Sequence, residues 1–306
     1  MLRVTTVREL EGMIKIARPV RREESLHRHT SFGIGGPADL LAAPGSIEEA
    51  GELAALCARE SVPWLVLGGG TNILVSDRGV RGVVIDLSLL SGIETDGSLV
   101  TALAGTPISE LSEFCLSRGL GGLEFAYALP GSVGGAVWMN ARCYEREMSD
   151  VLESVEYLDA DFVPRKRPME GKEWWYKHSP FQGMRALIMR AGFRLLQGDR
   201  ETMGRRMREH RQDRERKGHF LFPCAGSIFR NNRSFGAPTG KLIDSLGLKG
   251  TRIGGAQIAP FHGNIIVNTG GATARDVRAL IELVEEEVEK RLGFRLEREV
   301  VLVGEW

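Results

Sequence analysis

Two glycine-rich loops are the segments of this sequence best suited to hold a reactive cofactor. The first runs through Leu67, Gly68–Gly70, Thr71 and Asn72, directly after a short apolar run, and the second occupies residues 129–140. Glycine reaches positive φ and lets the backbone approach a ligand closely, so successive N–H groups can converge on phosphate oxygens. We therefore predict that the two loops together hold the diphosphate of a cofactor.

The charge balance agrees with a local anion site. Lys and Arg number 40, Asp and Glu number 40, and the net charge is zero. A neutral chain has no general attraction for nucleic acid or anionic lipid. We expect no nucleic-acid partner and no membrane insertion, and any anionic ligand must be held by positioned groups.

Composition and cysteine spacing limit the protein class. The 306 residues are 42% hydrophobic and 26% charged, which suits two globular domains. Four scattered cysteines (57, 115, 143 and 224) fit neither a disulfide framework nor a zinc site, so we expect buried thiols and no metal. The charged N-terminal segment lacks an apolar signal-peptide core, and no apolar stretch spans a bilayer, so we expect a soluble cytoplasmic protein.

A Rossmann dinucleotide site is the main competitor for the first loop, with Asp86 as its ribose ligand. Asn72 and Ile73 stand where the third glycine should be, and residues 72–77 lack a helical pattern, so we reject it. The plainer alternative is that each loop is only a tight turn. The presence of two such loops, each followed by an asparagine, favours a cofactor site.

The surrounding elements alternate between helix and strand. We expect a helix with a Ser46–Glu49 capping box, strands over 64–67 and 80–87, and a helix capped by Thr106 that ends at Gly119. Near the C-terminus we expect a helix from Thr273 to Gly293 and a final strand over 298–303. The highly charged residues 203–217 favour a solvated connecting helix over a nucleic-acid face, because acidic side chains are interspersed.

The order of several short motifs is similar to one family. These motifs are residues 29–38, 67–77, 129–141, 224–229, 240–244, 248–250, 252–256 and 296–300. On them the chain resembles UDP-N-acetylenolpyruvoylglucosamine reductase from about His29 to Trp306. Each motif alone is weak, and the specificity lies in their order and spacing.

The resemblance implies an α+β fold. It consists of a two-subdomain FAD-binding domain of the vanillyl-alcohol-oxidase (PCMH) type and a smaller α+β substrate-binding domain. We expect an N-terminal extension over 1–28, the FAD domain over 29–198 with its split near 88–98, a connecting helix over 199–217, and the substrate domain over 218–306. No inserted segment precedes Cys224, which resembles the shorter family type without the extra tyrosine loop.

The implied activity is the NADPH-dependent, FAD-mediated reduction of UDP-N-acetylglucosamine enolpyruvate to UDP-N-acetylmuramate, a step of peptidoglycan precursor synthesis. The resemblance implies non-covalent FAD, NADPH as co-substrate and a UDP-sugar as ligand, and we expect a monomer or a weak oligomer. Two alternatives stay open. One is another FAD oxidoreductase or oxidase of the same superfamily, and the other is a catalytically weakened flavin-binding paralogue.

The resemblance also assigns residues. Ser227 would donate the proton, Glu299 would orient the substrate carboxylate, and Lys177 would stabilise the enolate. The expected cofactor-binding residues are Ile34, Gly35, Gly36, Leu67, Gly68, Gly69, Gly70, Thr71, Asn72, Ile73, Pro130, Gly131, Ser132, Gly134, Gly135, Asn140 and Ala141. The expected substrate-binding residues are Tyr176, Arg230, Asn231, Lys241 and Arg252.

Several positions depart from the family pattern. Lys177 stands where the family shows arginine, and it keeps the charge but loses the planar fork that grips a carboxylate twice. The other departures are Gly33, Arg142, Cys143, Ala259 and Phe261. We expect His178, His27 and His29 to be structural.

Overall fold

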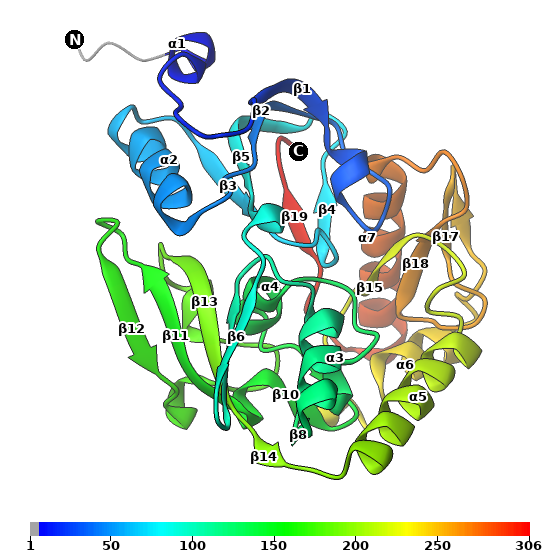
Figure 1. The fold of residues 1–306 in the computed structure, drawn as a ribbon. Helices are drawn as coiled ribbons and strands as arrows, with labels where there is room; N and C mark the ends of the chain where they lie inside the picture. The colour runs from blue at the N-terminus through cyan, green and yellow to red at the C-terminus, as the bar shows by residue number, and fades with distance from the viewer. Residues whose placement is uncertain (1–5) are drawn as a thin grey trace. The chain divides into compact units, whose positions relative to one another are not determined.

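The computed structural model describes residues 6–306 and divides them into two compact units (Figure 1). The first unit comprises the described residues up to Arg22 together with 39–69 and 82–213. The second unit comprises residues 23–38, 70–81 and 214–306. The predicted domains were contiguous, whereas each observed unit is assembled from three separate segments.

The first unit contains two main sheets, and β1, β2 and β5 each also include residues of the second unit. One sheet has the strand order β1 (Arg21–Ser25), β2 (Pro37–Ala42), β5 (Val80–Asp86), β3 (Trp64–Leu67). The other has the order β12 (Pro164–Pro168), β11 (Leu152–Leu158), β13 (Leu187–Arg194), β7 (Leu99–Leu103), β6 (Ile93–Asp96). Together with helices α2 (Ile47–Arg59), α3 (Ile108–Arg118) and α4 (Val133–Trp138), these sheets enclose one apolar core.

Helix α2 (Ile47–Arg59) buries the predicted apolar face, including Ala50, Leu53 and Ala54. Its N-cap Ser46 accepts a hydrogen bond from Glu49 N, as expected, but the reciprocal half of the capping box is absent. The Glu49 carboxylate instead accepts from Gly45 N at 2.7 Å and from Ala17 N at 2.8 Å. The prediction of a capping box was wrong because the Ala17 amide, distant in sequence, binds the Glu49 carboxylate instead.

Helix α3 (Ile108–Arg118) starts one residue later than predicted. Pro107 is its N-cap, without a side-chain cap bond, and Gly119 ends it with φ +68°. Thr106 was expected to cap this helix, but its hydroxyl pairs with the Gly92 backbone, accepting from the amide at 3.0 Å and donating to the carbonyl at 3.1 Å. Thr106 therefore joins the start of α3 to the loop before β6.

The short helix α4 (Val133–Trp138) packs on strands β13 and β7. A Cβ built on Gly134 would lie 2.9 Å from Ala104 Cβ, so only glycine permits this approach. The helix therefore fixes the position of the second glycine-rich loop, from which it begins.

The charged segment forms helix α5 (Arg200–Arg216), as the charge pattern indicated. The Tyr144 ring stacks on His210 at 3.9 Å, and its single hydroxyl proton is shared between two acceptors, His210 O at 2.9 Å and Asp213 Oδ2 at 3.0 Å. These contacts hold α5 within the first unit up to Asp213, where the division between the units falls.

The second unit is built on the sheet β15 (Cys224–Ser227), β18 (Ile265–Asn268), β17 (Ala256–Ile258), β16 (Arg252–Ile253). Helix α7 (Ala274–Leu292) packs on β17 and β16, and α6 (Thr239–Ser245) packs on α7. The predicted Thr273–Asp276 capping box is present, and Gly293 ends α7 at φ +74°.

The second unit also contains a separate pair of parallel strands. Strand β19 (Val301–Val303) pairs with β4 (Ile73–Val75), in register Val301 to Ile73. The final strand was predicted to begin at residue 298, but Arg298 forms only an isolated bridge to Phe229, and Glu299 lies outside the strand. The segment before Val301 is drawn towards the β15 loop, so it cannot extend the ladder.

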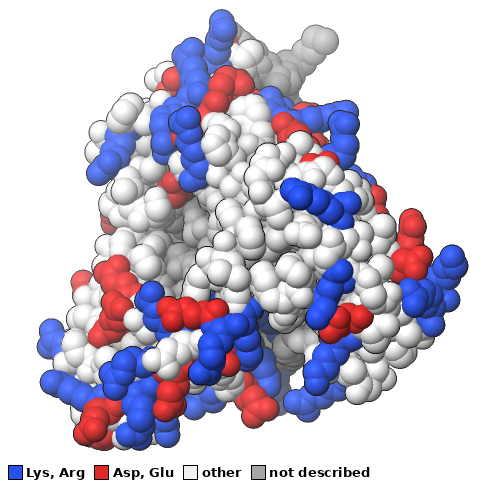
Figure 2. Space-filling model, turned by 90° about the vertical axis from the view of Figure 1, so that its right-hand side faces the viewer, with Lys and Arg blue, Asp and Glu red and all other residues white. Residues whose placement is uncertain are grey.

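Basic and acidic side chains are interspersed on the face drawn in Figure 2, in keeping with the zero net charge. Within residues 6–306, no helix combines the length and apolar character needed to cross a membrane.

Candidate functional site

The two glycine-rich loops touch each other within the first unit. A Cβ built on Gly68 would lie 2.5 Å from Ser132 Oγ, and one built on Gly69 would lie 2.7 Å from Gly131 Cα. Both distances are shorter than real Cβ contacts. Because Gly69 faces backbone atoms, which no side-chain rotation can move, its position excludes any larger residue. Backbone amides from two distant parts of the sequence are thus brought to one place, which is the arrangement that a diphosphate site requires.

Two other glycines of the second loop, Gly134 and Gly135, donate their amide hydrogens within the protein. Gly134 N donates to Ala104 O at 2.8 Å, and Gly135 N donates to the capping hydroxyl of Ser132 at 3.4 Å. We predicted both as cofactor-binding residues. Their amides donate within the protein, so these two N–H groups are not available to a phosphate.

In the second unit, the segment 29–38 packs against 70–81. Ser31 N donates to Gly70 O at 3.0 Å, and Gly36 N donates to Ser76 O at 2.9 Å. A Cβ on Gly70 would lie 2.0 Å from His29 O, and one on Gly36 would lie 2.2 Å from Asp77 O. Ile34 is buried in the core of this unit. These residues fix how the first glycine loop leaves Gly70.

A pocket of about 300 Å³ opens in the second unit and brings predicted residues together. Ser227, Asn231 and Lys241 all line it. The other lining residues are Pro238, Gly240, Asp244, Lys249, Phe261, His262, Gly263 and Asn264. A hydroxyl, an amide and a cation therefore face one cavity.

Ser227 lies at the end of β15, where the strand is irregular. Gly226 has φ +69°, and the pairing of β15 with β18 shifts register between Cys224 and Ser227. The next residues are held by Asn264, whose side chain accepts from Phe229 N at 2.9 Å and donates to Phe229 O at 2.7 Å. This bulge and the buried amide together set the position of the Ser227 side chain.

Glu299 is brought next to the same strand end. Its backbone N donates to Ile228 O at 2.7 Å, and its carbonyl accepts from Asn72 Nδ2 at 3.0 Å. Glu299 is buried. Glu299 therefore bonds the backbone of Ile228, the residue that follows Ser227, so two of the predicted catalytic residues lie near each other. Asn72, a predicted cofactor-binding residue, holds the Glu299 backbone in this place.

Comparison with known proteins shows which protein family the chain belongs to. A family model described as "UDP-N-acetylenolpyruvoylglucosamine reductase, C-terminal domain" matches residues 217–303, and one described as "FAD binding domain" matches residues 38–161. The UDP-N-acetylenolpyruvoylglucosamine reductase of Treponema denticola is 42% identical over 97% of this chain and 95% of its own length. The chain belongs to the UDP-N-acetylenolpyruvoylglucosamine reductase family.

Solved structures agree with this family and with the predicted fold class. The crystal structure of the family member from Thermus caldophilus has a TM-score of 0.78 at 36% identity, over 92% of this chain and 98% of that one. A Phl p 4 variant titled a glucose oxidase has a TM-score of 0.50 at 14% identity, over 63% of this chain and 44% of that one, which shows a shared fold alone. The expected α+β fold with an FAD-binding domain is confirmed.

Among the predicted substrate cations, the structure separates Lys241 from the arginines. Lys241 lines the pocket, on α6. Arg230 Nη1 instead pairs with Glu297 Oε1 at 2.7 Å, and Arg252 Nε donates to Gly254 O at 3.2 Å on the exposed β16–β17 hairpin. Neither arginine lines the pocket. In this member of the family, the pocket cation from the predicted set is Lys241.

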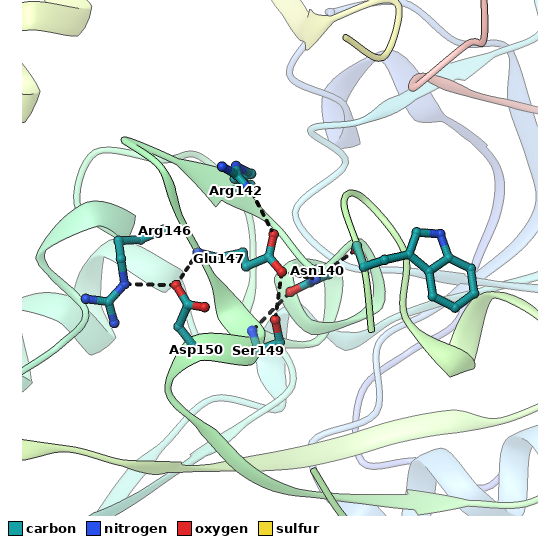
Figure 3. Close-up of polar contacts among 7 residues, drawn as sticks. Asn140, Arg142, Arg146, Glu147, Ser149 and Asp150 are labelled. Carbon is teal, nitrogen blue, oxygen red and sulfur yellow. Dashed lines mark hydrogen bonds and ion pairs between the residues drawn. The ribbon is translucent and has the colours of Figure 1, made fainter. Parts of the chain in front are cut away.

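Asn140 has a structural setting that differs from the predicted flavin contact (Figure 3). Its side chain is fully buried, and Nδ2 donates to Glu147 Oε1 at 3.2 Å and to Trp175 O at 3.0 Å. Its Oδ1 accepts from Ser149 N at 3.0 Å. Both amide hydrogens are therefore used within the protein. Ala141 N likewise donates to Ala136 O at 2.8 Å.

Lys177 and Tyr176 are the central residues of a tight turn in the first unit. The flanking Trp175 and His178 form an antiparallel bridge, and their rings stack at 3.4 Å. The Arg142 guanidinium lies 5.8 Å from the Tyr176 ring centroid, within the range of a cation–π contact. His178 therefore shapes the turn, which agrees with the structural role we expected for it.

Sequence reasoning missed several residues of the pocket. Asp244 and Lys249 form an ion pair at 2.9 Å, and His262 Nδ1 accepts from Asn264 N at 3.1 Å. Asp244 and Lys249 fall within motifs that carry the family resemblance, which was the available signal. No spacing rule connects them with Ser227, because the fold brings these segments together. Within residues 6–306, no cluster of three or more His, Cys, Asp or Glu side chains could hold a metal ion.

His262 should make stability depend on pH. Burial lowers the pKa of His262 below its ordinary value of 6.5, and the charges of Lys217 and Lys249 lower it further. Below pH 6.5 the unfolded chain then binds a proton at His262 that the folded protein does not bind. The free energy of unfolding therefore holds its full value above that pH and decreases as the pH falls. Denaturant titrations from about pH 8 to about pH 5.5 should show a smaller acid loss for His262→Asn than for the wild type. Parallel curves for the two proteins would contradict this.

Proposed function

We propose that the protein catalyses the NADPH-dependent, FAD-mediated reduction of UDP-N-acetylglucosamine enolpyruvate to UDP-N-acetylmuramate. The observation that carries this proposal is the pocket in which Ser227 lies with Asn231 and Lys241, in a chain of this reductase family. The reaction would place the enzyme in peptidoglycan precursor synthesis and in the cytoplasm.

The glycine loops fit an FAD diphosphate. The amides of Gly68, Gly69, Gly131 and Ser132 would hold it, because the two loops meet too closely for any side chain at Gly69. Bound FAD would supply to the substrate the hydride taken from NADPH. We also propose Thr71, Asn72, Ile73 and Pro130 as flavin contacts, as membership of the family implies.

The protein's own groups would complete the reduction by moving a proton. Hydride addition to the terminal enolpyruvyl carbon leaves negative charge on the adjacent carbon and its carboxylate. The Ser227 hydroxyl would give its proton to that adjacent carbon. A serine hydroxyl is a weak acid, and the proton moves because the accepting carbanion is much more basic.

Two further residues would stabilise the developing charge. Lys177 would place its ammonium at the enolate, and Glu299 would orient the carboxylate end of the substrate. Lys241 and Asn231, which line the pocket with Ser227, would bind the UDP-sugar, with Lys241 as a cation for phosphate oxygens.

Replacement of Lys177 by arginine should speed the second half of the reaction. A guanidinium holds a carboxylate through two parallel hydrogen bonds, whereas an ammonium acts as a point charge. Stopped-flow mixing of the NADPH-reduced enzyme with substrate should therefore give a higher rate for Lys177→Arg. Lys172→Arg, in the same exposed segment, serves as the matched control and should keep the wild-type rate. An equal or lower rate for Lys177→Arg would refute this role of Lys177.

One experiment separates the proposal from its alternatives. The purified protein should be yellow, should bleach under anaerobic NADPH, and should recover its colour on addition of UDP-N-acetylglucosamine enolpyruvate. Recovery only on admission of air would identify an oxidase. A yellow protein that NADPH does not bleach would instead be a flavin-binding paralogue without reductase activity.

A further inference from the structure

The turn that carries Lys177 has a backbone that needs external support. Trp175 N donates to His178 O at 3.4 Å, His178 N donates to Trp175 O at 2.9 Å, and Lys177 has φ +58°. A side chain with a Cβ seldom adopts this left-handed conformation, and it persists where the surroundings fix it. The direction in which Lys177 leaves the chain therefore depends on what holds this turn.

Two amide side chains hold the turn by its carbonyl groups. Asn140 Nδ2 donates to Trp175 O at 3.0 Å, and Gln182 Nε2 donates to Lys177 O at 3.0 Å. Gln182 also donates to Trp138 O at 3.0 Å. The carbonyls on either side of Tyr176 and Lys177 are thus tied to the end of α4 and the residues that follow it.

Asn140 is the more rigid of the two supports. It is fully buried, with 0% of its surface exposed, and its second amide hydrogen bonds Glu147 Oε1. Glu147 is fixed in turn by Ser149 Oγ at 3.0 Å and by Arg142 Nη1 at 3.3 Å (Figure 3). Because every polar atom of the Asn140 side chain has a partner, the amide can take only one orientation.

We propose that Asn140 is a positioning residue for Lys177, and that it acts through the Trp175 carbonyl. The catalytic part of this proposal rests on the proposed function, in which Lys177 stabilises the enolate. The geometric part, that Asn140 holds the turn, stands independently. On this assignment the loss of Asn140 impairs the step that uses Lys177 and leaves FAD binding intact.

The first test measures the turn without any substrate. Asn140→Gly removes the side chain but keeps a residue that accepts the φ of +43° found there. In the FAD-loaded protein, we expect trypsin to cleave after Lys177 about tenfold faster in this variant, measured by mass spectrometry. Cleavage after Lys172, in the neighbouring exposed segment, is the internal reference and should change little. Equal acceleration at both sites, or no change at Lys177, would overturn the proposal.

The second test concerns catalysis. The Asn140→Gly variant should retain FAD and bleach with NADPH at the wild-type rate, while its reoxidation by the enolpyruvyl substrate slows at least about tenfold. In a Lys177→Ala background the same change should add little further loss, because both substitutions remove one function. Independent, multiplying losses would overturn the proposal, and so would weakened FAD binding with an unchanged second half-reaction.

Two further variants guard against misinterpretation. Ser117→Ala removes an exposed hydroxyl that bonds Phe114 O and lies outside this hydrogen-bond network, so it should retain wild-type kinetics and slow cleavage at Lys177. Asn140→Leu keeps approximately the branched shape of the side chain and removes the donors, and it should reproduce the effects of Asn140→Gly if the latter folds poorly. A wild-type protein that ignores the enolpyruvyl substrate would refute the proposed function, while the cleavage result would still decide the geometric part.

Discussion

Replacement of Ser227 by alanine is expected to slow reoxidation by the enolpyruvyl substrate about 10²- to 10⁴-fold, the usual contribution of a positioned proton donor. The loss should be confined to this half-reaction, because bleaching by NADPH requires no proton from Ser227. Ser227 lies in the pocket at the end of β15, so alanine fits the same backbone and removes only the hydroxyl.

Stopped-flow absorbance measures both halves of this prediction separately. Ser117→Ala removes an exposed hydroxyl that bonds Phe114 O in the first unit, and it should behave as the wild type in both. Rapid recovery of colour in Ser227→Ala would show that another group gives the proton. Loss of bleaching as well would show that the substitution disturbs the flavin site, which contradicts the assigned role.

Replacement of Gly69 by alanine is expected to weaken FAD binding by about 10- to 100-fold. The added Cβ would lie 2.7 Å from Gly131 Cα and 3.1 Å from Gly131 C, both backbone atoms that no rotamer change can move. Overpacking of this kind costs about 1–3 kcal/mol, and each 1.4 kcal/mol corresponds to a factor of ten in affinity. The two loops would separate, and their amides would no longer converge.

Gly12→Ala is the control, since it adds the same methyl group at a glycine outside the two glycine-rich loops. Its Cβ would lie 3.5 Å from Glu9 O, an ordinary contact, and Gly12 has a φ of −63° that alanine adopts freely. Fluorescence titration of the apoprotein with FAD should give an affinity within about twofold of the wild type. If Gly69→Ala bound FAD equally well, the contact between the loops would not be part of the flavin site.

The glycine-rich loops could be predicted from the sequence because close contact between two backbones requires glycine. Where backbones meet as closely as Gly69 and Gly131, or Gly36 and Asp77, only glycine is possible, and a cluster of glycines reports such contacts. Helix ends governed by local bonds, such as Thr273 with Asp276, were equally accessible. These helix ends depend on residues three or four positions apart, so a local sequence pattern predicts them.

The features that escaped prediction depend on distant partners. Nothing local shows that Glu49 bonds the amide of Ala17, or that Asn140 bonds a carbonyl at residue 175. Asn140 was predicted to be a flavin ligand because it follows a glycine loop, whereas its donors are used by the polypeptide. The pocket around Ser227 likewise combines segments near residues 231, 241 and 262 that no periodicity connects.

The pairing of β4 with β19 has a consequence for biosynthesis. Residues 73–75 leave the ribosome long before residues 301–303, yet neither strand has its partner until both are available. The nascent chain can therefore form most of the first unit early, while residues 73–75 must wait for their strand partner until the end of translation. A polypeptide that stops before residue 301 would therefore lack the strand that pairs with β4.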